Sequence, residues 1–270
     1  MNATVQGIHL HYEVHGAGRP ILLVHGFPLS SQMWTPIVQR LKSRYRMIVP
    51  DVRGHGLSES SPKTSITQMA DDLAAILDRV NERNPVVVVG LSMGGYIALE
   101  FFRRHRPRVR GLVLADTRAA ADSPEKARER ALIAQRVLAE GSLVLAESMT
   151  NKLFAPDAPA DMKEVWKERI SHAKPEGVAA ALTAMAQRED SIALLPTIDV
   201  PTLVIVGEHD AITPVDEVRA MQQSIPGSEL VVVPGAGHLS PVEQPDRVAE
   251  ALKQFMARVK GASPEPAHLV

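Results

Sequence analysis

A run of β-branched residues that ends at a glycine-flanked serine is the feature that most constrains the fold of this chain. Residues 86–89 are four valines, the sequence Gly90-Leu91-Ser92-Met93-Gly94 follows, and a helical pattern begins soon after it. A strand that turns this sharply into a helix pushes the Ser92 hydroxyl out of the backbone, and the small glycines let neighbouring chain pass close by. Such a hydroxyl is accessible to a base, as a nucleophilic serine requires. The alternative is a tight glycine turn with no chemistry.

The composition argues against several other classes of protein. The chain has 270 residues, 45% of them hydrophobic, which is enough for a large buried core. Its 30 basic and 31 acidic residues nearly cancel, so no polyanion-binding surface and no nucleic acid partner are expected. The absence of cysteine excludes disulfides, a thiol nucleophile and thiolate metal sites. No signal-like N-terminus and no apolar stretch of ~18 residues occur, so we expect a soluble cytoplasmic protein without a membrane partner.

Short apolar runs alternate with helical patterns along the chain. The runs cover residues 21–24, 47–49, 86–89, 109–114, 203–206 and 230–233. Continuous apolar strands of this kind predict a parallel sheet that is covered on both faces. Residues 5–10 and 11–14 instead alternate around Gly7, which predicts an antiparallel edge hairpin. Apolar stripes from Ile66 to Val80 and from Pro245 to Val259 predict two of the covering helices.

One interval interrupts this alternation. Residues 118–195 have helical composition, many alanines and charges, and no strand-like run comparable to the others. We expect a helical cap (lid) over the carboxyl edge of the sheet, with residues 1–117 and 196–260 forming the core. A separate interaction domain or a helical linker is the alternative. Residues 261–270 lack periodicity and are expected to be a mobile tail.

Partners for the serine follow two later strands. The sequence Gly207-Glu208-His209-Asp210 follows the run at 203–206, and His238 follows the run at 230–233 within a glycine-rich loop. Parallel strands bring their carboxyl ends to one edge, so Ser92, Asp210 and His238 can converge as nucleophile, acid and base. Asp116 also follows a strand and is a second candidate for the acid. We prefer Asp210 as the acid. Asp116 is then expected to be the N-cap of the first helix of the helical cap, or to pair with Arg118.

On these segments the chain resembles enzymes of the α/β-hydrolase superfamily, in which nucleophile, acid and histidine follow in this order. Further similar segments are Val24-His25-Gly26-Phe27-Pro28 and the sequence DVRGHGLS at residues 51–58. The resemblance is strongest to small bacterial carboxylesterases and to 3-oxoadipate enol-lactonase-like hydrolases. It implies a mostly parallel eight-stranded sheet flanked by helices, with the cap inserted after strand 6. It also implies an oxyanion hole formed by the backbone N–H groups of Phe27 and Met93.

The function implied is that of a serine hydrolase that cleaves small carboxylic esters or lactones through an acyl-enzyme on Ser92. No cofactor and no metal are expected, because His209 and Asp210 alone lack the converging ligands of a catalytic metal site. A serine at the sharp strand-to-helix turn argues against dehalogenases and epoxide hydrolases of the fold, which carry an aspartate at that position. A carbon–carbon bond hydrolase, a cofactor-free perhydrolase with the same triad, and a small-ligand receptor of this fold remain as alternatives.

The substrate pocket is expected under the cap. Arg118, with Arg188 and Lys152 as further candidates, would suit a substrate that carries a carboxylate. Trp166 and Phe154 are the large aromatic residues of the cap, and either core packing or substrate contact suits them.

Overall fold

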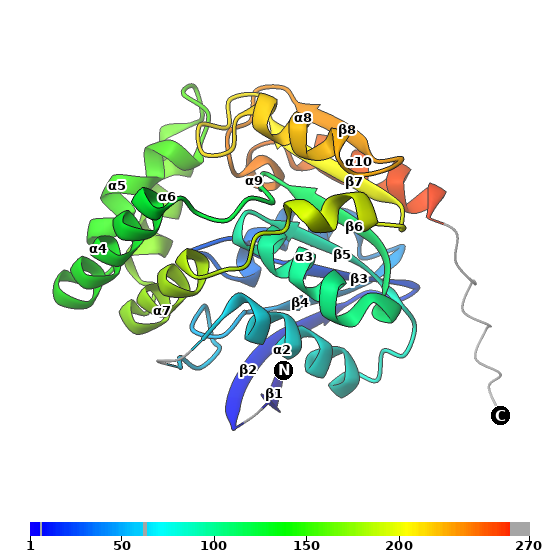
Figure 1. Cartoon of the computed structure of the whole chain (residues 1–270), viewed down its shortest axis with the longest axis horizontal. Coiled ribbons are helices and arrows are strands. Elements are labelled where there is room, and N and C mark those ends of the chain that lie inside the picture. The colour runs from blue at the N-terminus through cyan, green and yellow to red at the C-terminus, as the bar shows by residue number, and fades with distance from the viewer. Residues whose placement is uncertain (6, 62–63, 260–270) are drawn as a thin grey trace.

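A central β-sheet with helices on both faces forms the body of the computed structural model (Figure 1). The structure describes residues 1–5, 7–61 and 64–259, so the tail expected at residues 261–270 lies outside the described residues. The strands are β1 (Asn2–Val5), β2 (Ile8–His15), β3 (Arg19–Val24), β4 (Tyr45–Pro50), β5 (Val86–Leu91), β6 (Val109–Ala115), β7 (Thr202–Gly207) and β8 (Glu229–Val233).

The sheet has eight strands in the order β1-β2-β4-β3-β5-β6-β7-β8. The pairs β1–β2 and β2–β4 are antiparallel, and every other pair is parallel. All residues of β5 and β7 are buried, because helices cover both faces of the sheet at its centre. The predicted α/β-hydrolase fold with a mostly parallel eight-stranded sheet is therefore confirmed.

The edge hairpin divides differently from the sequence-based expectation. Residues 5–10 do not form one strand, because β1 ends at Val5 and Gly7, with φ +82°, lies in the turn that follows. The second strand, β2, then continues unbroken through residues 8–15 and pairs with both β1 and β4. Alternating residues occur on both sides of the turn, so the alternation alone did not locate it.

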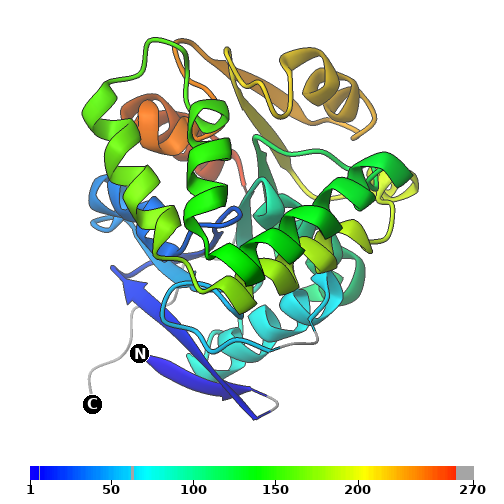
Figure 2. The same ribbon diagram turned by 90° about the vertical axis from the view of Figure 1, so that its left-hand side faces the viewer.

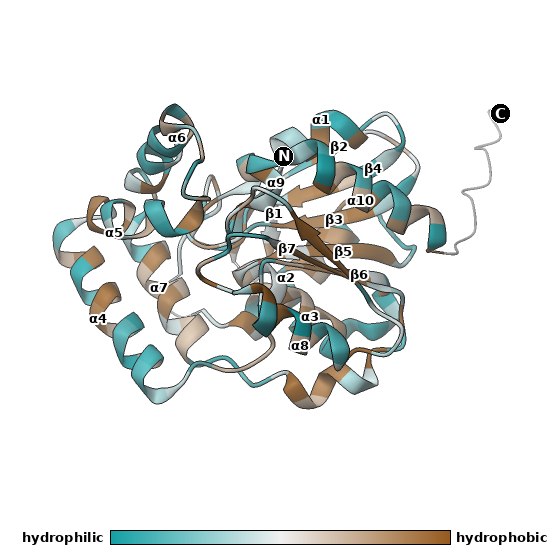
Figure 3. Cartoon of the chain, turned by 90° about the horizontal axis from the view of Figure 1, so that it is seen from above, coloured by the Kyte–Doolittle hydropathy of each residue, from teal (hydrophilic) through white to brown (hydrophobic). Residues whose placement is uncertain are grey.

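The helices of the core lie in two layers, one on each face of the sheet. Figure 3 shows α1 (Thr35–Leu41) and α10 (Pro245–Arg258) on one side of the strands, and α2 (Ile66–Arg79), α3 (Met93–His105) and α8 (Val215–Gln223) on the other. Short helices complete the core: η1 (Ser31–Trp34), η2 (Arg106–Arg108) and α9 (Ser240–Glu243). The apolar stripes of α2 and α10 are buried against the core, as their periodicity requires. None of the helices in the described ranges has the length and apolar character of a membrane span.

Between β6 and β7 the chain forms a group of helices at one side of the sheet (Figures 1 and 2). They are α4 (Pro124–Glu140), α5 (Leu143–Leu153), α6 (Ala160–Ser171) and α7 (Pro175–Ala186), followed by η3 (Ile192–Thr197). We call residues 118–195 the cap. Backbone of the cap touches Gly54, which follows β4, and Gly237, which follows β8. Because both glycines follow the carboxyl ends of strands, the cap lies over that edge of the sheet.

Candidate active site

The turn between β5 and α3 is closely packed around Ser92. Ser92 has φ +54° and ψ −115°, a backbone conformation that non-glycine residues rarely adopt. A Cβ atom on Gly90 would lie 2.1 Å from the carbonyl oxygen of Gly94, and one on Gly94 would lie 2.3 Å from that of Val24. Only glycine fits at these two positions, and the strained turn leaves the Ser92 side chain partly exposed.

Three side chains from the ends of three strands form one hydrogen-bonded chain. Ser92 Oγ lies 2.9 Å from Nε2 of His238, and Nδ1 of His238 lies 2.8 Å from Oδ2 of Asp210. His238 and Asp210 are 1% and 4% exposed, so water does not compete for this contact. With its proton on Nδ1, His238 donates to Asp210 and accepts the Ser92 hydroxyl proton at Nε2. The arrangement can therefore activate the serine as a nucleophile.

The Asp210 carboxylate is held by several donors besides the histidine. Its Oδ1 accepts hydrogen bonds from the backbone N–H groups of Ile212 and Thr213 at 2.8 and 2.9 Å, and Thr213 Oγ1 donates to Oδ2 at 2.5 Å. Burial by itself would raise the pKa of Asp210, but His238 and the Thr213 donors outweigh it and hold that pKa below its ordinary value. Asp210 is therefore ionised at neutral pH. An ionised carboxylate in this position can stabilise a histidine that becomes positively charged.

Asp116, the second sequence candidate for the acid, is fully buried beside this group but does not contact His238. Its Oδ1 accepts the N–H of Gly207 at 2.8 Å, and Ser240 Oγ donates to its Oδ2 at 2.6 Å. Burial, and then the negative charge of Asp210, raise the pKa of Asp116 well above its ordinary value. Asp116 thus fastens α9 to the end of β7, and its raised pKa favours the protonated form.

The expectation that Asp116 caps a helix or pairs with Arg118 is wrong. The first cap helix, α4, is capped by Ser123, whose side chain accepts a hydrogen bond from Lys126 N at 3.2 Å. The Arg118 guanidinium donates instead to the carbonyl of Ile212, and its Nε lies 3.2 Å from Glu217 Oε1. The reason is the backbone of Asp116, which has φ +47° at the end of β6 and places its side chain against β7 and α9.

The two expected oxyanion donors lie on segments next to Ser92. Met93 is the first residue of α3, and the N–H groups of a first helical turn have no partner within the helix. Phe27 follows β3, and a Cβ atom on the preceding Gly26 would lie 3.3 Å from Cβ of Ser92. The loop that carries Phe27 thus passes beside the serine.

Two buried histidines shape the loop that carries Phe27. His25 Nδ1 lies 2.9 Å from the Gly26 carbonyl, and its Nε2 accepts the N–H of Val52 at 3.0 Å. The ring of His55 packs edge-on against Phe27, with centroids 6.2 Å apart. Burial lowers the pKa of His25 and lowers that of His55 to about 3, so both stay neutral. Neither contacts Ser92 in the way that His238 does.

The cap residues expected to bind substrate lie mostly in protein contacts. Phe154 and Trp166 are buried, and the guanidinium of Arg169 stacks 4.5 Å from the centre of the Trp166 ring. Trp166 also lines a groove of about 560 Å³ with Pro28 and Leu29. The groove lies between α6 and the loops after β3 and β4, close to the Phe27 segment. Lys152 is exposed on α5.

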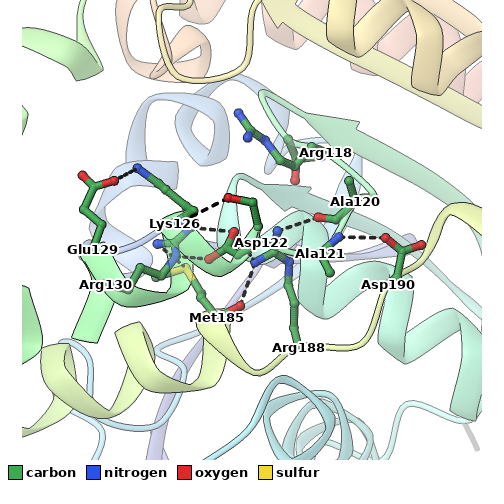
Figure 4. A network of polar contacts seen from close by, with 12 residues as sticks. Arg118, Ala120, Ala121, Asp122, Lys126, Glu129, Arg130, Met185, Arg188 and Asp190 are labelled. Carbon is green, nitrogen blue, oxygen red and sulfur yellow. Dashed lines mark hydrogen bonds and ion pairs between the residues drawn. The ribbon is translucent and has the colours of Figure 1, made fainter. Parts of the chain in front are cut away.

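A buried ion network joins the two chain segments that connect the cap to the core, and the sequence analysis did not find it. Figure 4 shows Asp122 between Arg130 and Arg188. Asp122 accepts from Arg188 at 2.7 Å and pairs with Arg130, and Arg188 also donates to the carbonyl of Ala120 at 2.6 Å. We call Asp122, Arg130 and Arg188 the cap clamp. Charged residues among alanines are typical of solvent-exposed helix faces, so the sequence carried no signal for this cluster.

The family model of the α/β hydrolase fold matches residues 19–245 of the chain. This span includes the Ser92 turn, the cap, and the loops of Asp210 and His238. The chain belongs to the α/β-hydrolase family.

Named relatives cover nearly the whole chain. A pimeloyl-[acyl-carrier protein] methyl ester esterase of Chromobacterium violaceum is 30% identical, over 86% of this chain and 91% of that protein. The 3-oxoadipate enol-lactonase 1 of Acinetobacter baylyi is 29% identical, over 94% of this chain and 96% of that protein. The solved structure of a thermophilic esterase from Thermogutta terrifontis, with malate bound, is 43% identical and has a TM-score of 0.94, over 97% of this chain and 99% of that one.

Proposed function

We propose that this protein is a serine hydrolase that cleaves small carboxylic esters or lactones through an acyl-enzyme on Ser92. The observation that carries the proposal is the hydrogen-bonded chain from Ser92 Oγ through the His238 ring to Asp210. A serine aligned with a buried, carboxylate-bound imidazole is suited to acyl transfer.

Ser92, His238 and Asp210 each have a defined task in this reaction. His238 Nε2 takes the proton of the Ser92 hydroxyl as Oγ attacks the substrate carbonyl, and the negative charge develops on the carbonyl oxygen. The N–H groups of Phe27 and Met93 are the donors for that oxyanion. His238 then gives its proton to the leaving alkoxide, which departs and leaves an acyl group on Ser92. The same imidazole then activates a water molecule, which attacks the acyl group and releases the carboxylic acid product from Ser92. Asp210 stabilises the imidazolium during both acylation and deacylation.

The named relatives support a carboxylic-ester hydrolase. Their names include a methyl ester esterase, an enol-lactonase and an esterase. A lactone is a cyclic ester, so the same attack opens it, with the leaving alkoxide staying attached to the acyl group. Both substrate forms therefore belong to the proposal.

Steady-state hydrolysis of p-nitrophenyl esters from acetate to decanoate, and of simple lactones, tests the proposal with wild type and Ser92→Ala side by side. We expect multiple turnovers by the wild type, a chain-length optimum that reports the size of the acyl pocket, and loss of activity in Ser92→Ala. A single slow turnover would indicate a ligand receptor of this fold instead. Wild-type turnover confined to carbon–carbon substrates would also contradict the ester assignment.

A further inference from the structure

The cap touches the loop that carries His238. We call residues 234–239, between β8 and α9, the histidine loop. A Cβ atom on Gly237 would lie 2.5 Å from both the Ala155 nitrogen and the Phe154 carbonyl carbon of the cap. On the other side of His238, Leu239 N donates to the carbonyl of Leu153 at 3.0 Å. Backbone of the cap thus lies directly on the residues before and after the histidine.

Glu243, the last residue of α9, connects these two segments through a single carboxylate. Its Oε1 accepts the N–H of Gly237 at 2.8 Å, and its Oε2 accepts the N–H of Ala155 at 2.8 Å. One oxygen thus holds the histidine loop and the other holds the cap, so neither segment can move away without breaking a hydrogen bond to Glu243.

We propose that Glu243 is a positioning residue for His238. Its carboxylate fixes the histidine loop to Ala155 of the cap, and the position of the base therefore depends on the position of the cap. The inference rests on the proposed function, since it assigns His238 as that base. Proton transfer depends on the 2.9 Å separation of Nε2 and Ser92 Oγ. A misplacement of 1 Å at a reacting group can cost about 100-fold in rate.

The remaining anchors of the histidine loop do not involve the Glu243 side chain. His209 N donates to the carbonyl of Ala236 at 2.8 Å, and Ser240 is held by Asp116. Asp210 holds the imidazole itself. A Glu243 variant should therefore keep its fold and its triad, while the histidine loop and the cap lose the attachment that they share through Glu243 and keep the bond from Leu239 N to the Leu153 carbonyl.

Glu243→Gln is the sharpest variant, because the amide keeps the size of the side chain but has only one oxygen that can accept. One of the two N–H groups, on Gly237 or on Ala155, then faces an amide NH₂ group. Glu208→Gln is the matched control. Glu208 Oε2 accepts the N–H of Gly235 in the same loop at 3.0 Å, and the side chain is about half exposed. The control thus perturbs the loop at a carboxylate that does not join it to the cap.

The first readout is kcat and KM for a p-nitrophenyl ester, with active sites counted by a fluorophosphonate that labels nucleophilic serines. For Glu243→Gln we expect kcat per labelled site to fall about tenfold while KM stays within about threefold, and for Glu208→Gln we expect wild-type values. Glu243→Asp, which keeps the charge but shortens the side chain by one methylene group, should show the same pattern. A kcat per labelled site within about twofold of wild type in both Glu243 variants would overturn the proposal, whatever their thermal stability.

The second readout, hydrogen–deuterium exchange, does not require activity. In Glu243→Gln we expect faster exchange both in peptides that contain Ala155 and in peptides that contain Gly237, and in Glu208→Gln in neither of the two. Unchanged exchange, or acceleration in only one of the two segments, would contradict the coupling. If the wild type hydrolysed no ester, the proposed function would fail, while the exchange data would still decide whether Glu243 joins the cap to the loop.

Discussion

His238 Nδ1 lies 2.8 Å from Asp210 Oδ2, in a site where a second buried carboxyl group, Asp116, bonds to Ser240 instead. The two acids differ in the direction of their pKa shifts as well as in their contacts. His238 and Thr213 hold the pKa of Asp210 low, whereas burial and the neighbouring Asp210 raise that of Asp116. Asp210 is therefore suited to stabilise an imidazolium, whereas Asp116 holds α9 in place.

Replacing the charged acid should nearly abolish turnover. In Asp210→Asn the amide leaves His238 in the wrong tautomer, and kcat should fall about 10⁴-fold, the loss typical of an orienting carboxylate. Asp116→Asn should lower kcat by less than about tenfold, because Asp116 bonds to Gly207 and Ser240 and Asp210 is the carboxylate bonded to His238. Ester kinetics of the two variants check this, and a larger loss in Asp116→Asn would reverse the assignment.

The Ser92 turn should not accept a methyl group at Gly94. In Gly94→Ala the new Cβ would meet the carbonyl oxygens of Val24 and His25 at 2.3 and 2.8 Å. We expect a loss of about 3 kcal/mol in the free energy of unfolding, at the upper end of what overpacking costs. Gly227→Ala is the control, since its new Cβ meets nothing within 4 Å and it should cost only about 1 kcal/mol for its positive φ. Urea unfolding compares them, and equal losses would refute the packing argument.

The cap clamp should make stability depend on pH. Burial alone would raise the pKa of Asp122, but Arg130 and Arg188 outweigh it and lower that pKa below its ordinary value. The ionised form thus stabilises the folded state above the ordinary pKa of about 4, and this contribution is lost as pH falls through the lowered folded value.

Asp122→Asn removes this contribution and leaves buried arginine charge unpaired. At pH 7 we expect a loss of about 3 kcal/mol, or roughly 6–12 °C in Tm. The difference in Tm between wild type and variant should shrink as the pH is lowered below about 4. Thermal unfolding between pH 3 and 7 measures it, and a difference that does not change with pH would show that Asp122 is not ionised in the clamp.

The contact between Gly54 of the core and Gly177 of α7 should set how closely the cap approaches. In Gly177→Ala the new Cβ would lie 1.8 Å from the carbonyl oxygen of Gly54, so α7 must move away. We expect about 2 kcal/mol of lost stability and a raised KM for esters. Thr183→Ala, at an exposed position of the same helix, is the control and should change neither quantity. Wild-type KM in Gly177→Ala would show that the cap does not need this close contact.

The sequence predicted the fold because its strongest signals are local. The valine run, the glycines around Ser92 and the apolar stripes of α2 and α10 each depend on neighbouring residues. The hydrogen-bonded chain followed from topology, since the parallel strands of one sheet bring Ser92, Asp210 and His238 to one edge whatever the details of packing.

Contacts that depend on tertiary packing were not predictable in the same way. Glu243 and Ala155 are 88 positions apart, and Asp122 and Arg188 are 66 apart. From sequence, a charged side chain is predicted to be solvent-exposed, because the pattern of neighbouring residues carries no information about its tertiary partners. The predicted role of Asp116 was wrong for the same reason. Its partner Ser240 lies on α9, and α9 is brought to Asp116 only by tertiary packing.

Mapping of a covalent adduct on the wild-type protein tests the central claim most directly. The protein is treated with a p-nitrophenyl phosphonate ester, digested, and the modified residue is identified by peptide mass spectrometry, with Asp210→Asn and Ser92→Ala treated in parallel. We predict one adduct per chain, on Ser92, formed much more slowly in Asp210→Asn and absent from Ser92→Ala. An adduct on another residue, or ester hydrolysis that persists undiminished in Ser92→Ala, would contradict the assignment of Ser92 as the nucleophile.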